Sequence, residues 1–411
     1  MSTQPNIIVI MTDDQRWDTV TPLAMPFVYD RFQQGIRFVN AFTTTALCCP
    51  SRMNFLTGNL ASVHGIHTND GELSVGPDQD TLATRLHTAG YRTGLFGKYV
   101  NNYNRLGPPN VAQWHVPPGW DSWAAIALPV NAYLNYTLVT GPTATQSYGD
   151  AASDYLTDVL RDRAAVFIDQ ALQDNVPFFA FVTPFAPHTA TADQMVATRH
   201  AGTFASLPPW RPPSHAEADV SDKGSLMQIP IVPGKISTTD GYRILQYEAL
   251  LAVDEMVEEL FHILIRHEAL DQTIVVYLSE QGLFWYEHRL TGKNMPYDEA
   301  HRIPLLIRYP AALGSVGRSE TGLATIQDVS ATLAEWGGAL PLGVGASMVA
   351  SLTAGQALPR VSIPLEGWNA DNTSLYSGVR TANNKLFTWS VTQEIEEYNL
   401  VTDSYEMSSL Q

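Results

Sequence analysis

The sequence predicts an α/β protein with a large mixed, mostly parallel sheet sandwiched by helices and a small C-terminal antiparallel sheet. Mostly apolar runs rich in Ile, Val and Phe occur at residues 6–11, 178–185 and 273–278. Such runs are typical of parallel strands buried on both faces. Helical periodicity separates them, whereas short strand-like segments follow residue 350. We therefore predict a main α/β unit over residues 1–349 and a small α+β unit over residues 350–411 that packs on it.

The composition argues against several classes of partner. The chain has 411 residues, of which 45% are hydrophobic and 16% charged, and its net charge is −17. So acidic a chain is not expected to bind nucleic acid or an anionic membrane surface. Its two cysteines provide no disulfide framework, and the apolar run at residues 6–11 is too short for a signal sequence or a membrane span. We therefore expect a cytoplasmic protein.

Two aspartates, Asp13 and Asp14, directly follow the first predicted strand and its terminal threonine. One of them could simply cap the next helix. That interpretation leaves the second carboxylate unexplained, because adjacent carboxylates repel each other unless a cation neutralises them. Open α/β sheets bind ligands at the carboxyl ends of their strands, and hard divalent ions prefer oxygen ligands. The pair is therefore a candidate metal site.

The two cysteines are adjacent, in the segment Cys48-Cys49-Pro50-Ser51-Arg52. Adjacent cysteines rarely bond to each other, so they could be two small buried residues ahead of a helix that Ser51 caps. A helix that begins near Ser51 would also point its backbone N–H groups at Cys48 and favour an anion there.

Polar residues follow other predicted strands as well. These residues are Lys98 after a strand at 91–96, His188 after the strand at 178–185, and Glu280 with Gln281 after the strand at 273–278. A lysine or histidine in such a place is usually a solvated or loop residue. These strand ends, however, are expected on the same sheet edge as the two aspartates, and such convergence is what a functional site requires.

The remaining periodic segments predict helices that cover the sheet. They lie at residues 81–90, 155–172, 242–267 and 328–336. Asp254 and the glutamates near it in the third helix are expected to form a solvated face. Residues 189–240 show little periodicity, and a connection of this length is expected to shape access to a site.

Longer motifs show which family the chain resembles. The pattern Cys48-x-Pro50-Ser51-x-x-x-x-Leu56-Thr57-Gly58, with Arg52 in place, resembles the signature of the type I, formylglycine-dependent sulfatases of the alkaline phosphatase superfamily. The segment from Gly97 to Tyr103 is similar to the branch that includes the N-acetylglucosamine-6-sulfatases. Residues 297–308, shortly after Lys293, resemble a further family segment. The resemblance covers nearly the whole chain and implies an alkaline-phosphatase-like architecture.

The resemblance also implies roles for individual residues. Cys48 would be converted to formylglycine, the nucleophile, while Arg52, Lys98 and Lys293 bind the sulfate group. His188 would protonate the leaving alcohol. A divalent ion, with Ca²⁺ as the first candidate and Mg²⁺ or Mn²⁺ as alternatives, would be held by Asp13, Asp14, Cys48, Glu280 and Gln281. The substrate would also contact Asn101 and Arg380.

Two positions depart from the family pattern. Glu280-Gln281 stands where most members have Asp followed by His, Asn or Gln, and glutamate is one methylene longer than aspartate. Many members carry Gly-Lys-Trp-His, whereas here Val100 occupies the place of the histidine, and Asn101 is the nearest polar candidate for its function.

We therefore expect a sulfuric ester hydrolase that acts on an organic sulfate ester of a sugar or an aryl alcohol, after maturation by a formylglycine-generating enzyme. One alternative is a phosphodiester or phosphonate monoester hydrolase that uses the same site. The other is a non-hydrolytic, sulfatase-like binding protein, which the two departures favour. No pattern in the sequence indicates the oligomeric state.

Overall fold

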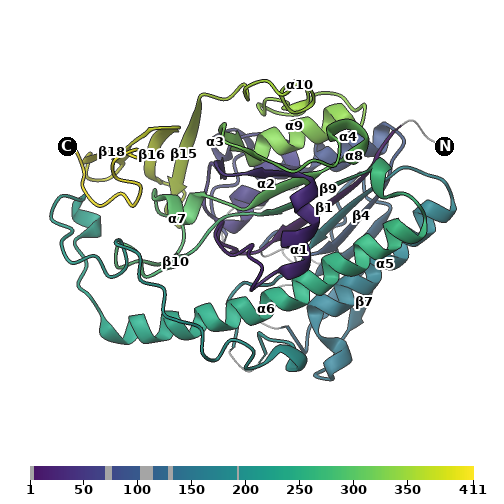
Figure 1. Cartoon of the computed structure of the whole chain (residues 1–411), viewed down its shortest axis with the longest axis horizontal. Coiled ribbons are helices and arrows are strands. Elements are labelled where there is room, and N and C mark those ends of the chain that lie inside the picture. The colour runs from purple at the N-terminus through teal and green to yellow at the C-terminus, as the bar shows by residue number, and fades with distance from the viewer. Residues whose placement is uncertain (1–3, 70–75, 102–113, 128–132, 192–193) are drawn as a thin grey trace.

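A computed structural model describes residues 4–69, 76–101, 114–127, 133–191 and 194–411. At its centre lies a ten-stranded sheet with helices on both faces (Figure 1). In spatial order, its strands are β13 (Arg318–Glu320), β2 (Ile36–Phe38), β12 (Leu305–Arg308), β9 (Thr273–Ser279), β1 (Asn6–Thr12), β8 (Phe178–Thr183), β4 (Arg92–Gly97), β5 (Ser122–Ile126), β6 (Thr137–Gly141) and β7 (Ala144–Ser147). The strands from β9 to β5 run parallel, whereas β12 and the β6–β7 hairpin are antiparallel to their neighbours. The predicted mixed, mostly parallel sheet is confirmed.

The helices form two layers. One layer consists of α1 (Pro26–Arg31), α5 (Leu156–Gln173) and α6 (Pro233–Arg266), and the other contains α2 (Cys48–Thr57), α4 (Leu82–Thr88) and α9 (Ile326–Trp336) (Figure 1). Short helices occur at α3 (Ala61–His64), α7 (Asp298–His301), α8 (Pro310–Leu313) and α10 (Val349–Ala354). Because both faces of the sheet are covered, residues 7–11 of β1 are fully buried, as their unbroken apolar sequence predicts.

The register of the central strands aligns their carboxyl ends. Thr12 pairs with Ser279, and Gly97 pairs with Thr183. The residues that follow these strands therefore begin at one edge of the sheet. Gly97 has a φ of +130°, and a Cβ atom there would collide with the backbone of Thr183, so the glycine before Lys98 lets the two strand ends lie close together.

The C-terminal part of the chain forms the predicted antiparallel sheet. Its strands are β15 (Ser362–Trp368), β16 (Ser374–Thr381), β17 (Asn384–Trp389) and β18 (Ile395–Asn399). Smaller pairs are formed by β3 (Ala41–Phe42) with β14 (Ala324–Thr325) and by β10 (Phe284–Trp285) with β11 (Thr291–Gly292). A second hydrophobic core joins the C-terminal sheet to the main unit through residues such as Phe42, Phe284 and Tyr297. The division after residue 349 stays a prediction.

Two predicted helices differ from the structure. Helix α2 begins at Cys48 rather than near Ser51, so Ser51 lies in its first turn and does not cap it. Helix α6 begins at Pro233 and runs for 34 residues, well before the predicted start. The expected solvated face on α6 is wrong for Asp254, which is buried and accepts hydrogen bonds from the backbone N–H groups of Phe27 and Val28. It therefore caps the start of α1.

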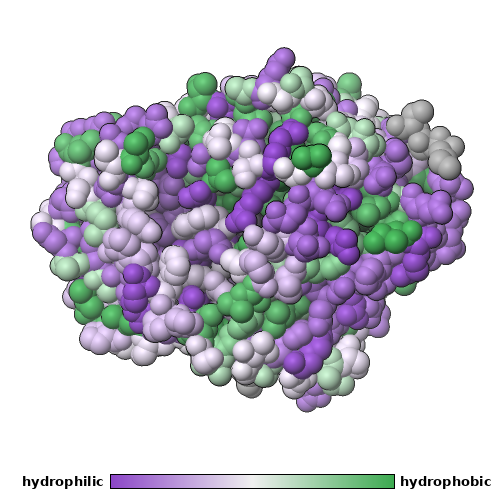
Figure 2. Space-filling model, in the orientation of Figure 1, coloured by the Kyte–Doolittle hydropathy of each residue, from purple (hydrophilic) through white to green (hydrophobic). Residues whose placement is uncertain are grey.

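The surface in Figure 2 is mostly hydrophilic, with small hydrophobic patches scattered across it. Within the described part of the chain, none of the helices combines the length and the hydrophobicity that crossing a bilayer requires.

Candidate active site

The first turn of α2 lies against the carboxyl ends of β1, β4 and β9. Cys48 is the first residue of the helix, and Leu47 before it has extended backbone angles and makes no side-chain cap. Pro50 fits in the first turn because its missing N–H would have no partner within the helix. All ten residues of α2 are buried, so the start of the helix is held firmly beside the strand ends.

Both aspartates after β1 are buried and paired with lysines. Asp13 accepts a hydrogen bond from Lys98 and lies 3.4 Å from the Arg52 guanidinium, between Oδ2 and NH2. Asp14 accepts a hydrogen bond from Lys293. The φ of Asp14 is 60°, in the left-handed region, which aspartate tolerates better than most residues. Residues from four separate segments therefore meet at this edge, as the sequence predicts.

Cys48 lies inside this group of charges. Its Sγ is 2.8 Å from Lys293 Nζ, 3.4 Å from Gln281 Nε2 and 3.9 Å from Asp13 Oδ1. Burial is the main cause that raises the pKa of the Cys48 thiol to about 12, with Glu280 acting in the same direction. An unmodified thiol here stays protonated at neutral pH and is a poor nucleophile.

Nearby cations keep the Asp13 carboxyl in its charged form. Burial alone would raise the pKa of Asp13, but Lys98, His188 and Arg52 outweigh it and hold that pKa well below its usual range. Burial would likewise lower the pKa of Lys293, yet the attraction of Asp14 and its neighbours keeps it well above the ordinary value. Both lysines and Asp13 are therefore charged, and a compact site of alternating charges results.

His188 lies on the opposite side of Asp14 from Lys293. Its Nε2 is 3.5 Å from Asp14 Oδ2, and its Nδ1 is 2.8 Å from the carbonyl oxygen of Thr189. Because that carbonyl can only accept, Nδ1 carries the hydrogen, and Nε2 is the atom that faces the site. The ring stacks on Phe185, with 4.6 Å between the centroids, which fixes its orientation. Burial lowers the pKa of His188, although Asp14 and Asp13 act in the opposite direction.

Glu280 and Gln281 face different partners. The Glu280 carboxylate forms an ion pair with Arg52 Nε, and Lys98 Nζ lies 3.9 Å away. Burial raises the pKa of Glu280 to about 7 despite Arg52. Gln281 donates from Nε2 to Asp14 Oδ1 at 2.6 Å and to Glu280 Oε1 at 2.9 Å.

The donor set fits a divalent cation. Ligand atoms of Asp13, Asp14, Cys48 and His188 lie within 4.8 Å of one another. Gln281 Oε1 is buried and accepts no hydrogen bond from any residue that the structure describes. A buried amide oxygen without a partner is costly unless a cation or a water satisfies it, and oxygen atoms of this kind suit Ca²⁺, Mg²⁺ or Mn²⁺.

The two predicted substrate contacts lie in different surroundings. The backbone N–H of Asn101 is 3.0 Å from Cys49 Sγ, and Asn101 Oδ1 is buried without a hydrogen-bond partner in the described ranges. Arg380 is not brought to Cys48. It is buried, its NH2 pairs with Asp298 Oδ2 at 3.0 Å, and its guanidinium covers the ring of Phe42. Their contact with substrate stays a prediction, and Tyr103 of the branch motif lies outside the described residues.

Sequence reasoning missed two supporting contacts. Ser51 donates to the carbonyl oxygen of Glu280, and Thr43 lies 2.8 Å from the Ser51 hydroxyl, so Ser51 ties α2 to the end of β9. Gln246 on α6 donates from Nε2 to the Pro187 carbonyl at 3.3 Å and accepts from Trp285 Nε1 at 2.6 Å. The motif around Cys48 signals the first of these contacts, whereas nothing in the local sequence signals the second.

Comparisons with known proteins identify the family of the chain. The sulfatase family model matches residues 5–339. The extracellular sulfatase SULF-1 homolog of Drosophila melanogaster is 31% identical over 346 residues, which cover 82% of this chain and 30% of that protein. Human N-acetylglucosamine-6-sulfatase is 30% identical over 326 residues, covering 75% of this chain and 56% of that protein. The chain thus spans about half or less of the length of these two relatives.

A solved structure has the same fold. It is described as a complex with its substrate, D-glucosamine-2-N,6-O-disulfate, and matches with a TM-score of 0.85 and 23% identity, covering 99% of this chain and 93% of that one. One relative is named as extracellular, which gives no support to the predicted cytoplasmic location, and that location stays a prediction. The match over residues 5–339, together with the two curated relatives, shows that the chain belongs to the sulfatase family.

Proposed function

We propose that the protein hydrolyses an organic sulfate ester, with a sulfated sugar as its substrate class, and that formylglycine made from Cys48 is the nucleophile. The observation that carries this proposal is the meeting of Cys48 with Lys98, Lys293 and Arg52 beside two buried aspartates. In a chain with a net charge of −17, such a cluster of cations provides a local binding site for a tetrahedral anion.

The sugar as substrate class rests on the relatives. Human N-acetylglucosamine-6-sulfatase and the solved complex with a disulfated glucosamine are both named for sulfated sugars. The chain's own motif from Gly97 to Tyr103 is similar to that branch. Maturation by a formylglycine-generating enzyme is part of the proposal, because an unmodified Cys48 thiol would stay protonated.

Of the five predicted ligands, Asp13, Asp14 and Gln281 would hold a divalent ion, with Ca²⁺ as the first candidate and Mg²⁺ or Mn²⁺ as alternatives. Glu280 is paired with Arg52 instead, and a role for Cys48 as a ligand stays a prediction. A bound ion would supply positive charge that makes a nearby hydroxyl more acidic and polarises a sulfate oxygen. The free Gln281 Oε1 and the two carboxylates support this assignment.

The remaining residues of the cluster bind charge and transfer a proton. Lys98 and Lys293 would neutralise the sulfate oxygens, where preformed positive charge stabilises the transition state. Arg52 is held by Glu280 and donates from NH1 to the Lys98 carbonyl at 2.6 Å, so it fixes the position of Lys98. His188 presents Nε2 to the site and would donate its proton to the departing alcohol oxygen. A bound sulfate beside the ring would favour the protonated imidazole that this step needs.

The first test is mass spectrometry of the peptide that ends at Arg52, on protein from a host with an active maturation system. The proposal expects the mass of formylglycine at position 48, and release of inorganic sulfate that Cys48→Ala abolishes. Unmodified cysteine in such a host would contradict the formylglycine mechanism. Matched aryl sulfate, phosphate diester and phosphonate monoester substrates separate the classes of reaction. A higher kcat/KM for the phosphorus esters would favour the phosphohydrolase alternative, and no turnover of any ester by protein that carries formylglycine would favour a binding protein.

A further inference from the structure

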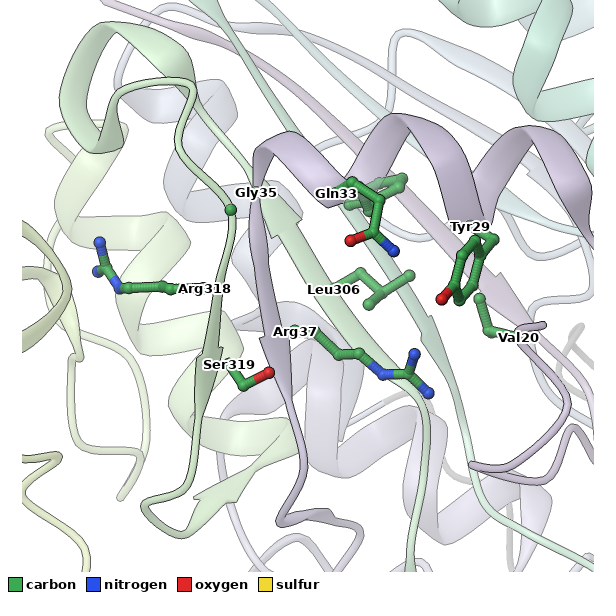
Figure 3. Close-up of a pocket in the computed structure, with 10 residues that line it drawn as sticks. Val20, Tyr29, Gln33, Gly35, Arg37, Leu306, Arg318 and Ser319 are labelled. Carbon is green, nitrogen blue, oxygen red and sulfur yellow. The ribbon is translucent and has the colours of Figure 1, made fainter. Parts of the chain in front are cut away.

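Two hollows outside the charged cluster differ in what they can bind. One, of about 340 Å³, lies at the sheet edge formed by β2 and β13. Figure 3 shows that its arginines, Arg37 and Arg318, point in opposite directions. Because they do not converge on one ligand, this hollow carries no proposal. The other hollow, which we call the α6 cleft, has a volume of about 590 Å³ and adjoins the active site.

The α6 cleft is lined by residues that adjoin two members of the charged cluster. Thr189, which follows His188, lines one part of it, and Gly292, which precedes Lys293, lines another. Trp285 and Tyr242 contribute apolar walls. A cavity of this size with apolar walls and few polar groups is typical of a small-molecule site. Its position beside His188 is where the alcohol part of a sulfate ester must lie if His188 protonates the leaving oxygen.

The charge of the α6 cleft is unusual for this protein. The chain contains 41 acidic and 24 basic residues, yet none of the described residues that line the cleft is an aspartate or a glutamate, and Lys235 is the only one among them that carries a full charge. The cleft would therefore attract a neutral or anionic ligand, whereas most of the surface repels anions.

Lys235 also differs from the other lysines. The sequence contains five, and four of them form ion pairs with acidic residues: Lys98 with Asp13, Lys223 with Glu217, Lys293 with Asp14 and Lys385 with Asp298. Lys235 is exposed in the first turn of α6 and forms no ion pair with any residue that the structure describes. The cation at the cleft is thus free for a ligand.

We infer that the α6 cleft binds the alcohol part of the substrate and that Lys235 pairs with a second anionic group on it. This inference rests on the proposed sulfatase function. It makes the preferred substrate a sulfate ester with two anionic groups, one in the cluster beside Cys48 and one at Lys235. The exposed ring of Tyr242, which lines the cleft, suits a sugar or aromatic ring between these groups.

The test compares glucosamine 6-sulfate with D-glucosamine-2-N,6-O-disulfate, for the wild type and for Lys235→Gln and Lys235→Glu. The wild type is expected to prefer the disulfate. The ratio of kcat/KM for disulfate over monosulfate should fall about tenfold in Lys235→Gln, as expected for the loss of one charge-assisted hydrogen bond, and further in Lys235→Glu. Arg85→Gln changes the net charge equally at a partly exposed position of α4, where Arg85 pairs with Asp80, and it should leave the ratio unchanged.

If both Lys235 variants still release sulfate but show an unchanged ratio, the inference is overturned and the proposed function stands. Failure to hydrolyse either ester by protein that carries formylglycine would instead contradict the proposed function. In that case, the Kd of the disulfate, measured by calorimetry for the wild type and for Lys235→Gln, still tests the second anion site. A Kd about tenfold weaker in Lys235→Gln would support the second anion site, and an equal Kd would refute it.

Discussion

Gln246 provides a specific test of how the fold positions His188. This buried side chain bridges α6 to the turn before His188, through its hydrogen bond to the Pro187 carbonyl, and it also accepts from Trp285 Nε1. Gln246→Met keeps the length of the side chain but removes both interactions. Each buried group left without a partner costs about 1–3 kcal/mol. If about 1.4 kcal/mol of this cost is added to the activation free energy because His188 is misplaced, the rate falls about tenfold.

The assay uses two esters that depend differently on proton donation. A sugar alcohol is a poor leaving group and needs a proton from His188, whereas nitrophenolate leaves readily from its sulfate ester without an acid. We expect Gln246→Met to lower kcat about tenfold for the sugar sulfate and less than about threefold for the aryl ester. Trp285→Phe removes the indole hydrogen bond and part of the wall of the α6 cleft but keeps the contact of Gln246 with Pro187, so it should show a smaller difference between the two esters. Equal losses for the two esters in Gln246→Met would refute the positioning role.

Three further predictions test the buried charges. Asp298→Asn should lower the free energy of unfolding, measured in urea titrations, by about 3–5 kcal/mol. The reason is that Asp298 pairs with both Arg380 and Lys385, the latter at 2.6 Å, and both cations would lose this counter-charge. A loss below about 1 kcal/mol would contradict this expectation. Burial alone would lower the pKa of His288, but Glu217 and Glu299 outweigh it and raise that pKa to about 10. The charged His288 therefore stabilises the fold fully below about pH 6.5, and this contribution is lost as the pH rises to about 10. His288→Asn should flatten the dependence of the unfolding free energy on pH in this range, and an unaltered slope would contradict the assignment. Asp13→Asn should abolish the rise in Tm on adding Ca²⁺, Mg²⁺ or Mn²⁺, whichever the wild type binds, whereas a retained rise would exclude Asp13 as a ligand.

The sequence predicts the strand ends well and the helix contacts poorly. An apolar run such as residues 7–11 ends sharply at polar residues, so Asp13 and Glu280 are expected at one sheet edge once their strands are taken as parallel neighbours, as they are in the structure. The start of α2 at Cys48 could not be predicted, because Leu47 before it offers no capping side chain. Asp254 contacts Phe27, which lies 227 positions earlier in the chain, and Gln246 contacts Pro187, which lies 59 positions earlier. No local sequence pattern encodes such pairs.

Glu280 stands where the resemblance to the sulfatases predicts an aspartate, and its partner in the structure gives a physical reason for the longer side chain. The longer side chain pairs with Arg52, while Gln281 turns its amide toward Asp14. The two residues thus have different roles. Glu280 neutralises Arg52, which positions Lys98, and Gln281 offers a neutral oxygen beside the two aspartates. A metal site with two carboxylates and one amide carries less negative charge than one with three carboxylates. Because ligand charge tunes Ca²⁺ affinity, we expect a weaker and more readily exchanged ion than an additional aspartate ligand would give.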